Sequence, residues 1–235
     1  MTRSPYYDES HEAFRATVRR FVDKEIAPFV DEWDEAGGFP RELYKKAADV
    51  GILGLGYPEE FGGSPCDQFH RIVLSQELAR AASGGVAASL MSHTIGSPPI
   101  LAVGPAAMKQ RVLPQVLAGE KISALAITEP SGGSDVAQLK TTAKRVGDHY
   151  VVNGSKMFIT SGVRADFYTV AVRTGGPGAS GVSLLLIERG MEGFTQQPLR
   201  KMGWWASDTA QLFFDDVKVP VENLIGEENK GFKYV

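Results

Sequence analysis

The chain is poor in cysteine and histidine. Cys66 is the single cysteine among 235 residues, so an internal disulfide framework is excluded and a reducing compartment is expected. The four histidines are scattered along the sequence, with no partner at metal-ligand spacing. The sequence therefore predicts neither a disulfide-stabilised fold nor a metal site.

Long apolar runs and a strong excess of one charge are also lacking. No run approaches the roughly 18 apolar residues that a membrane span requires, and the net charge of −3 is spread without a basic stripe. We therefore expect no membrane and no nucleic acid as partner. The first fifteen residues, MTRSPYYDESHEAFR, show neither a secretory signal nor a transit peptide, so a cytoplasmic protein is expected.

The first half of the chain has the apolar spacing of helices. Helices are predicted over residues 10–33, 40–51, 85–91 and 105–119. Pro28 must kink or interrupt the first of them, and Asp67 can cap a further helix that follows it. These patterns predict an all-α domain over residues 1–121.

The second half has the pattern of strands. Strands are predicted over residues 122–127, 150–152, 157–160, 167–172, 182–187 and 210–214. Between two of them, Asn153-Gly154 predicts a hairpin with a type I′ turn, because both central residues must accept positive φ. No helical crossover separates the strands, so a β-barrel or sandwich is expected over residues 122–226 rather than a parallel sheet. The fold class is thus α+β.

A glycine-rich segment, Ser131–Asp135, directly follows the strand that ends at Thr128. Its small residues would let the backbone approach a bulky ligand, and Ser134 could donate to a phosphate or an amide. The residues alone favour a plain β-turn over a ligand-binding loop.

Three segments together resemble a known family. AITEPSGGSD at residues 126–135 resembles the signature TEPxxGSD of acyl-CoA dehydrogenases, and NGSKMFITSG at 153–162 resembles their NGxKxWITNG segment. IGEENKGF at 225–232 resembles the segment that leads into the family's C-terminal helical domain. The resemblance covers nearly the whole chain, in the family's order. It implies a helical domain and then a β-barrel, with the chain truncated near the start of a helical bundle at residues 227–235.

The resemblance implies FAD as the cofactor. The residues carried over as its contacts are Leu125, Ala126, Ile127, Thr128, Gly133, Ser134, Phe158, Ile159 and Thr160. Thr128 would face the pyrimidine edge of the flavin, and Phe158 would pack against the ring. Ile159 and Thr160 would serve its N5 and O4 region. Ser134 would lie near the pyrophosphate and would also contact the acyl-CoA substrate.

The implied reaction is α,β-dehydrogenation of an acyl-CoA thioester to the 2-enoyl-CoA, in fatty-acid or branched-acyl catabolism. The implied electron acceptor is an electron-transferring flavoprotein, and the implied assembly is a homotetramer. In the family the base is a glutamate on the C-terminal bundle, so no catalytic residue is assigned here and the chain alone is expected to be inactive. Glu129 is expected to fix the signature turn.

Three departures from the family pattern stand out. Phe158 stands where Trp is more common, Ser161 replaces a common Asn, and Trp204-Trp205 stands where many members have an Arg. For the two tryptophans, packing in the barrel or at an interface is the favoured interpretation. Two other functions stay open: an acyl-CoA oxidase or flavin monooxygenase relative, and a truncated module that binds without turnover.

Overall fold

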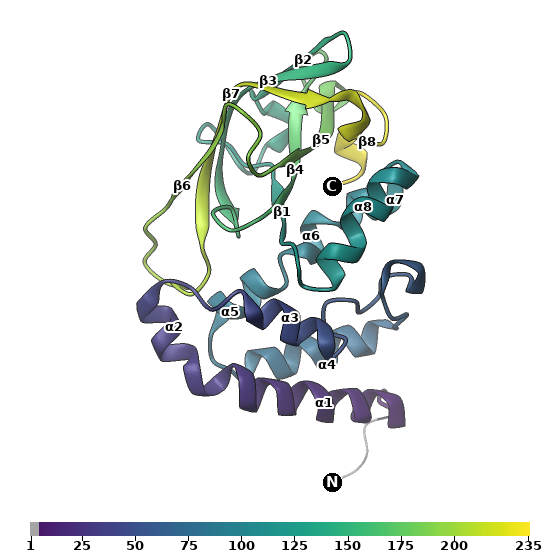
Figure 1. Ribbon diagram of the computed structural model, residues 1–235, viewed down its shortest axis with the longest axis vertical. Helices are drawn as coiled ribbons and strands as arrows, with labels where there is room; N and C mark the ends of the chain where they lie inside the picture. Colours follow the sequence, from purple (N-terminus) through teal and green to yellow (C-terminus); the bar gives the residue numbers. More distant parts are fainter. Residues whose placement is uncertain (1–4) are drawn as a thin grey trace. The chain divides into compact units, whose positions relative to one another are not determined.

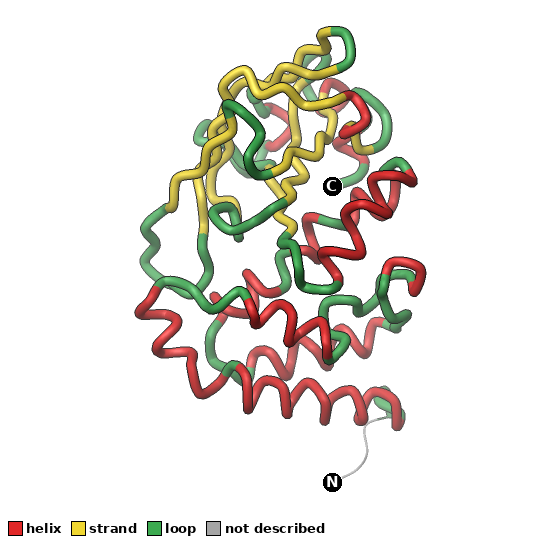
Figure 2. Tube along the Cα trace, viewed as in Figure 1, coloured by secondary structure: helices red, strands yellow, loops and turns green. Residues whose placement is uncertain are grey.

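The computed structural model describes residues 5–235 and divides into two compact units. Residues 1–4, part of the predicted helical domain, lie outside the described residues. The helical unit comprises the described residues up to 91, with 114–120 and 201–207. The sheet unit comprises 92–113, 121–200 and 208–235. Helices dominate the first part of the chain and strands the second, which confirms the predicted α+β class (Figure 2).

The helical unit contains five complete helices among its described residues, together with the end of a sixth helix at residues 114–117. The five complete helices are α1 (Glu9–Glu25), α2 (Val30–Ala36), α3 (Glu42–Asp49), α4 (Gln68–Ala79) and α5 (Gly84–Leu90). A 3₁₀ turn at Ala27–Phe29 separates α1 from α2, as predicted from Pro28, and the Asp67 carboxylate caps α4 by accepting the amide of His70 at 3.0 Å. The paired helices α1 and α4 are held by Glu77, a buried carboxylate that bonds the guanidinium of Arg19.

Three further helices follow: α6 (His93–Gly96), α7 (Pro98–Val103) and α8 (Ala106–Leu117). Within the sheet unit, α6 is bonded to two strands. Ser92, just before α6, donates to the carbonyl of Ser123 in the first strand at 2.9 Å, and Thr169 of the fourth strand donates to the carbonyl of Gly96 at 2.6 Å. Among residues 5–235, no single helix is long and apolar enough to cross a membrane. The helical stretches 84–90 and 93–103, which are bent by 43° relative to each other, have the required length and composition only when they are counted together.

Eight strands form one mixed sheet. They are β1 (Ser123–Ala126), β2 (Thr142–Val146), β3 (His149–Thr160), β4 (Phe167–Arg173), β5 (Val182–Glu188), β6 (Phe194–Pro198), β7 (Thr209–Pro220) and β8 (Leu224–Ile225). Their order is β6-β7-β3-β2-β4-β5-β8, with β1 paired in parallel to β4 (Figure 1). Strands β4 and β5 are buried along nearly their whole length and form the centre of the core.

The predicted hairpin at Asn153-Gly154 is wrong. Strand β3 runs through both residues, and the tight turn lies instead at Gly147-Asp148, between β2 and β3. Gly154 does adopt positive φ, 138°, but it does so in a bulge where the pairing of β3 with β7 shifts register. The Asn153 side chain exchanges two hydrogen bonds with Asp216 of β7, at 2.8 and 2.9 Å, so long-range pairing overrides the local turn preference.

The bulge generates a stability prediction. A Cβ at Gly154 would lie 2.8 Å from the Thr141 Cα, whereas a Cβ at Gly147, also at positive φ, would meet nothing within 4 Å. Gly147→Ala should therefore cost about 1 kcal/mol of unfolding free energy, from backbone strain alone. Gly154→Ala adds steric overlap and should cost roughly 3 kcal/mol or more. Urea unfolding of both variants measures the difference, and equal losses would contradict the bulge geometry.

Candidate functional site

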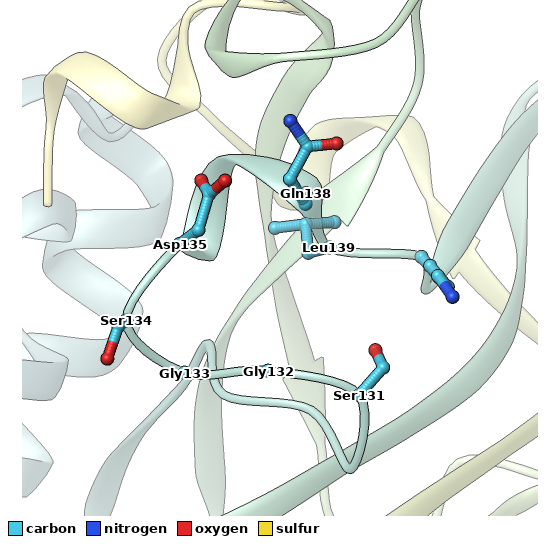
Figure 3. A pocket seen from close by; sticks show the side chains of 8 residues that line it. Ser131, Gly132, Gly133, Ser134, Asp135, Gln138 and Leu139 are labelled. Atoms are coloured by element: carbon cyan, nitrogen blue, oxygen red, sulfur yellow. The ribbon is translucent and has the colours of Figure 1, made fainter.

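The segment after β1 makes a tight turn that opens a cleft. Glu129 and Gly132 exchange two backbone hydrogen bonds, each 3.1 Å long. The loop that follows lines a cleft of about 510 Å³, whose walls are Ser131, Gly132, Gly133, Ser134, Asp135, Gln138, Leu139 and Lys140. In Figure 3 the two serines lie at opposite ends of the glycine pair, and the Ser134 side chain points away from Asp135. The glycines leave bare backbone between the two hydroxyl groups.

A buried ion pair joins this turn to strand β3. The Lys156 ammonium lies 2.9 Å from a carboxylate oxygen of Glu129 and donates to the carbonyl of Ile127 at 3.0 Å. The Glu129 carboxylate also accepts the backbone amides of Lys140 at 2.6 Å and Thr141 at 2.8 Å. The side chains of Lys156 and Glu129 are 0% and 5% exposed, so water does not screen the pair. The carboxylate thereby ties together three segments of the sheet unit, as expected for a residue that fixes the turn.

The pKa values of Lys156 and Glu129 both lie below their ordinary values. Burial lowers the pKa of Lys156 to about 8, although the charge of Glu129 acts in the opposite direction. Burial by itself would raise the pKa of Glu129, but the hydrogen bonds from Thr141 and Lys156 and the lysine charge outweigh it, so the pKa lies below its ordinary value. Glu129 is therefore ionised near neutral pH and is a poor base.

Phe158 occupies a strained position beside the turn. It lies in a second irregularity of β3, where the register against β7 shifts between Lys156 and Ile159, and its φ is 62°. Left-handed backbone is rare for a bulky aromatic residue and costs free energy. The side chain is 63% exposed, so core packing does not explain the position. The preceding residue, Met157, donates its amide to the carbonyl of Thr128 at 2.8 Å, which fixes the bulge against the turn.

The segment after β3 forms a turn that is hydrogen-bonded to Asp208. Thr160 pairs with Thr209 of β7, and the amide of Ser161 donates to the carbonyl of Asp208 at 2.9 Å. One carboxylate oxygen of Asp208 accepts the amide of Val163 at 2.8 Å. The other is buried and has no hydrogen-bond partner among residues 5–235, and burial raises the pKa of this carboxyl.

The structure brings the two predicted groups of site residues together. Leu125 and Ala126 end β1, Ile127 and Thr128 follow it, and the Thr128 carbonyl meets the bulge that carries Phe158. Gly133 lies against Thr128, since a Cβ there would come within 3.1 Å of the threonine methyl group. The side chains of Ala126 and Ile159 are buried, which leaves their backbone groups as the parts that a ligand could use.

Lys156 is the site residue that sequence reasoning missed. Its partner Glu129 is 27 positions away, so no local spacing reveals the pair. The signal was the alternation along β3: Tyr150, Val152 and Lys156 share one face of the strand, and all three are buried. A lysine in phase with apolar residues requires a buried anion.

Trp204 and Trp205 belong to the helical unit rather than to the sheet. Both remain exposed, although the Trp204 ring lies against Gly84 at the start of α5. The Trp205 indole N–H donates to the carbonyl of Lys201 at 2.8 Å. Of the two alternatives predicted for them, packing in the barrel is wrong, because the loop between β6 and β7 that carries them belongs to the helical unit. Packing at an interface stays a prediction.

Comparison with known proteins identifies the family. Residues 8–120 match the family model for the acyl-CoA dehydrogenase N-terminal domain, and residues 124–217 match that for the middle domain. The chain belongs to the acyl-CoA dehydrogenase family. It is 41% identical over 233 residues to the mitochondrial long-chain specific acyl-CoA dehydrogenase of Rattus norvegicus. That match covers 97% of this chain and 54% of the relative, so the chain spans about half the length of that protein.

Solved structures agree with the family models. An acyl-CoA dehydrogenase from Mycobacterium smegmatis superposes with a TM-score of 0.96 at 50% identity, over 98% of this chain and 61% of that one. An acyl-CoA dehydrogenase from Bacillus anthracis, solved in complex with FAD, gives a TM-score of 0.90 at 34% identity, over 98% and 41%.

The buried ion pair predicts that replacing Lys156 lowers the free energy of unfolding far more than replacing Lys144, another lysine of the sheet unit. Lys156→Met leaves the Glu129 carboxylate buried without its cation and should cost about 3–5 kcal/mol of unfolding free energy. Lys144→Met, at an exposed position of β2, should change it by less than about 0.5 kcal/mol. Denaturant unfolding of both variants measures the effect. Losses of similar size would mean that the pair does not hold the turn.

The lowered pKa of Lys156 predicts a pH range in which the free energy of unfolding changes. In the folded chain Lys156 releases its proton near pH 8, and in the unfolded chain near 10.5. Between these values the unfolded state binds more protons, so rising pH relieves the cost of burying the charged lysine and favours folding. The free energy of unfolding of the wild type, minus that of Lys156→Met, should therefore rise from pH 8 to 10.5 and stay level from pH 6 to 7.5. A level difference throughout would contradict the lowered pKa.

Proposed function

We propose that this chain forms the FAD-binding part of an enzyme that converts an acyl-CoA thioester to its 2-enoyl-CoA. The observation that carries the proposal is Phe158, an exposed aromatic side chain held at positive φ on a bulge bonded to Thr128. Strain of this kind persists where the surrounding fold imposes it, and it clusters at ligand sites. Family membership and the FAD complex of the B. anthracis relative support the same assignment.

The residues of the sheet unit fit FAD in size and chemistry. The Phe158 ring offers a flat apolar face for the isoalloxazine, and the backbone from Leu125 to Thr128 offers donors and acceptors for its pyrimidine edge. Bare backbone at Gly133 and the hydroxyl of Ser134 suit a pyrophosphate. The Lys140 side chain adds a cation to the same cleft, and Asp135 is the one carboxylate in its lining.

FAD, when bound, supplies the oxidant that takes the hydride from the β-carbon of the substrate. The protein's part in that chemistry is orientation and electrostatics. Thr160, with Ile159, would donate hydrogen bonds at the N5 and O4 side of the ring, and Phe158 would exclude water from one face. Ser134, at the far end of the turn, would serve both the cofactor and the acyl-CoA.

Glu129 is not the base that removes the α-proton. Its carboxylate is held by Lys156 and two backbone amides, with its pKa lowered, so a proton would bind it weakly. We assign its role to the geometry of the turn and assign no base among the described residues. In line with the family, an electron-transferring flavoprotein is proposed as the electron acceptor and a homotetramer as the assembly.

The most direct test is FAD binding followed by flavin fluorescence or absorbance. The purified chain should bind FAD with one site per chain. Phe158→Gly should weaken binding by about tenfold or more, equivalent to about 1.4 kcal/mol, because the stacking face is lost. Without FAD the same variant should be more stable by about 1 kcal/mol, since glycine accepts positive φ.

Phe158→Trp is the matched control, because it keeps both the strain and an aromatic face. It should bind FAD within about threefold of the wild type, a difference of less than 1 kcal/mol. A Phe158→Gly variant with unchanged FAD affinity would remove Phe158 from the site. A folded wild-type chain that takes up no FAD would refute the proposed function.

Thr160 tests the hydrogen bond to the flavin. Thr160→Ala should lower the two-electron reduction potential of bound FAD by roughly 20–60 mV, the equivalent of losing one hydrogen bond worth about 1–3 kcal/mol. Thr160→Ser retains the hydroxyl and should leave the potential close to that of the parent. Equal potentials in both variants and the parent would show that Thr160 does not contact the ring.

A further inference from the structure

Two short segments with the same pattern meet in the helical unit. Asp8 and His11 start α1, Asp67 and His70 start α4, and in each segment the aspartate caps the helix while the histidine lies three residues later. The spacing of these histidines along the chain predicts no metal role, because 58 residues separate them. In the fold their ring centres lie 4.2 Å apart.

The carboxylate of Asp67 contacts a nitrogen atom of each ring. It is 3.0 Å from Nε2 of His11 and 2.8 Å from Nδ1 of His70. One ligand atom from each of the three residues lies within 4.8 Å of the others. Ligand atoms bound at about 2.0–2.1 Å to one tetrahedral or octahedral ion are roughly 3.0–3.4 Å apart. The two distances from the Asp67 carboxylate to the histidine nitrogens therefore need to lengthen by only a few tenths of an ångström for the three residues to hold an ion.

We propose that His11, Asp67 and His70 form a binding site for a divalent transition-metal ion such as Zn²⁺. Two imidazole nitrogens and one carboxylate oxygen are a donor set that Zn²⁺ accepts, with water completing a tetrahedron. The site lies wholly within the helical unit and is independent of the proposed flavin chemistry.

Asp8 supplies the outer partner that metal-binding histidines usually have. Its carboxylate is 2.8 Å from Nδ1 of His11, on the side of the ring away from Asp67. Nδ1 of His11 accepts the backbone amide of Asp8 at 3.0 Å, so in the metal-free chain Nε2 carries the ring proton and donates to Asp67. With a metal on Nε2, the ring proton would move to Nδ1 and donate to the Asp8 carboxylate in place of the bond from the Asp8 amide, which would orient the imidazole. The remaining hydrogen bonds of the Asp8 carboxylate, from Ser10 and the amide of His11, hold it in place.

The surroundings fix the rings and leave one side open. The ring of Phe69 lies edge-on to His11, and that of Phe14 lies 5.7 Å from His70. His11 is buried, whereas the side chain of Asp67 is 51% exposed, so an ion can enter from solvent and keep a water ligand. The ligands are therefore partly preorganised.

The partial positive charge of the two helix N-termini disfavours a bound cation, and the negative charges of the two aspartates offset it. Each helix N-terminus carries the equivalent of roughly half a positive charge. Two such ends meet here, but Asp8 and Asp67 together bring two negative charges to the same place. The local balance is negative, which favours a divalent ion over a monovalent anion.

The test is isothermal titration of ZnCl₂ into the purified 235-residue chain, prepared without a histidine tag and treated with a chelator. One Zn²⁺ should bind per chain. His70→Gln and Asp67→Asn should each weaken binding at least tenfold; Asp67→Asn retains a side-chain oxygen to cap α4. Circular dichroism of the metal-free variants confirms that they fold. With Co²⁺ as the probe, the visible absorption should show nitrogen and oxygen ligation.

Two controls separate this site from other donors. His149→Gln removes a histidine of the sheet unit, and Cys66→Ser removes the thiol next to Asp67; both should bind Zn²⁺ as the wild type does. A wild-type chain without Zn²⁺ binding would overturn the proposal. So would binding that survives in His70→Gln and Asp67→Asn, or that disappears in Cys66→Ser with a thiolate band in the Co²⁺ spectrum.

Discussion

The buried ion pair between Lys156 and Glu129 is the constraint on which the arrangement of the sheet unit depends. One carboxylate receives the lysine and two backbone amides, and the same lysine holds the carbonyl of Ile127. The end of β1, the start of β2 and the middle of β3 are thus fixed at one point. A charged pair shielded from water tolerates little displacement, because any gap leaves a charge without compensation. The strained position of Phe158, two residues after Lys156, is held by this connection and by the Met157–Thr128 bond.

Much of the fold could be predicted because it is encoded locally. The helices follow from apolar spacing and from caps such as Asp67, and the break between α1 and α2 follows from Pro28. Asn153-Gly154 misled because its need for positive φ was interpreted as a turn, while β3 runs on through it and pairs with β7 across a register shift. Strand β2 escaped prediction because only Ala143 of its five residues is buried, so it lacks an apolar alternation.

Some residues of the candidate site could likewise be predicted from local sequence, and others could not. The backbone contributors proposed at 125–128 and 158–160 could be predicted because family motifs mark them. Lys156 could not be predicted in this way, because its role depends on Glu129, which lies in the turn after β1. The histidines show a third case: His11 and His70 lie far apart in sequence, and the repeated Asp-x-x-His pattern was the available signal. Pairing between helices, which no local pattern specifies, decides whether such residues meet.

We propose that the turn after β1 and the bulge of β3 together bind FAD. Hydrogen–deuterium exchange of the chain, with and without FAD, tests it most directly. The account predicts that FAD slows exchange in peptides that cover residues 125–135 and 157–161, while α1 and α4 exchange as before. Protection confined to other segments, or no protection at saturating FAD, would contradict it.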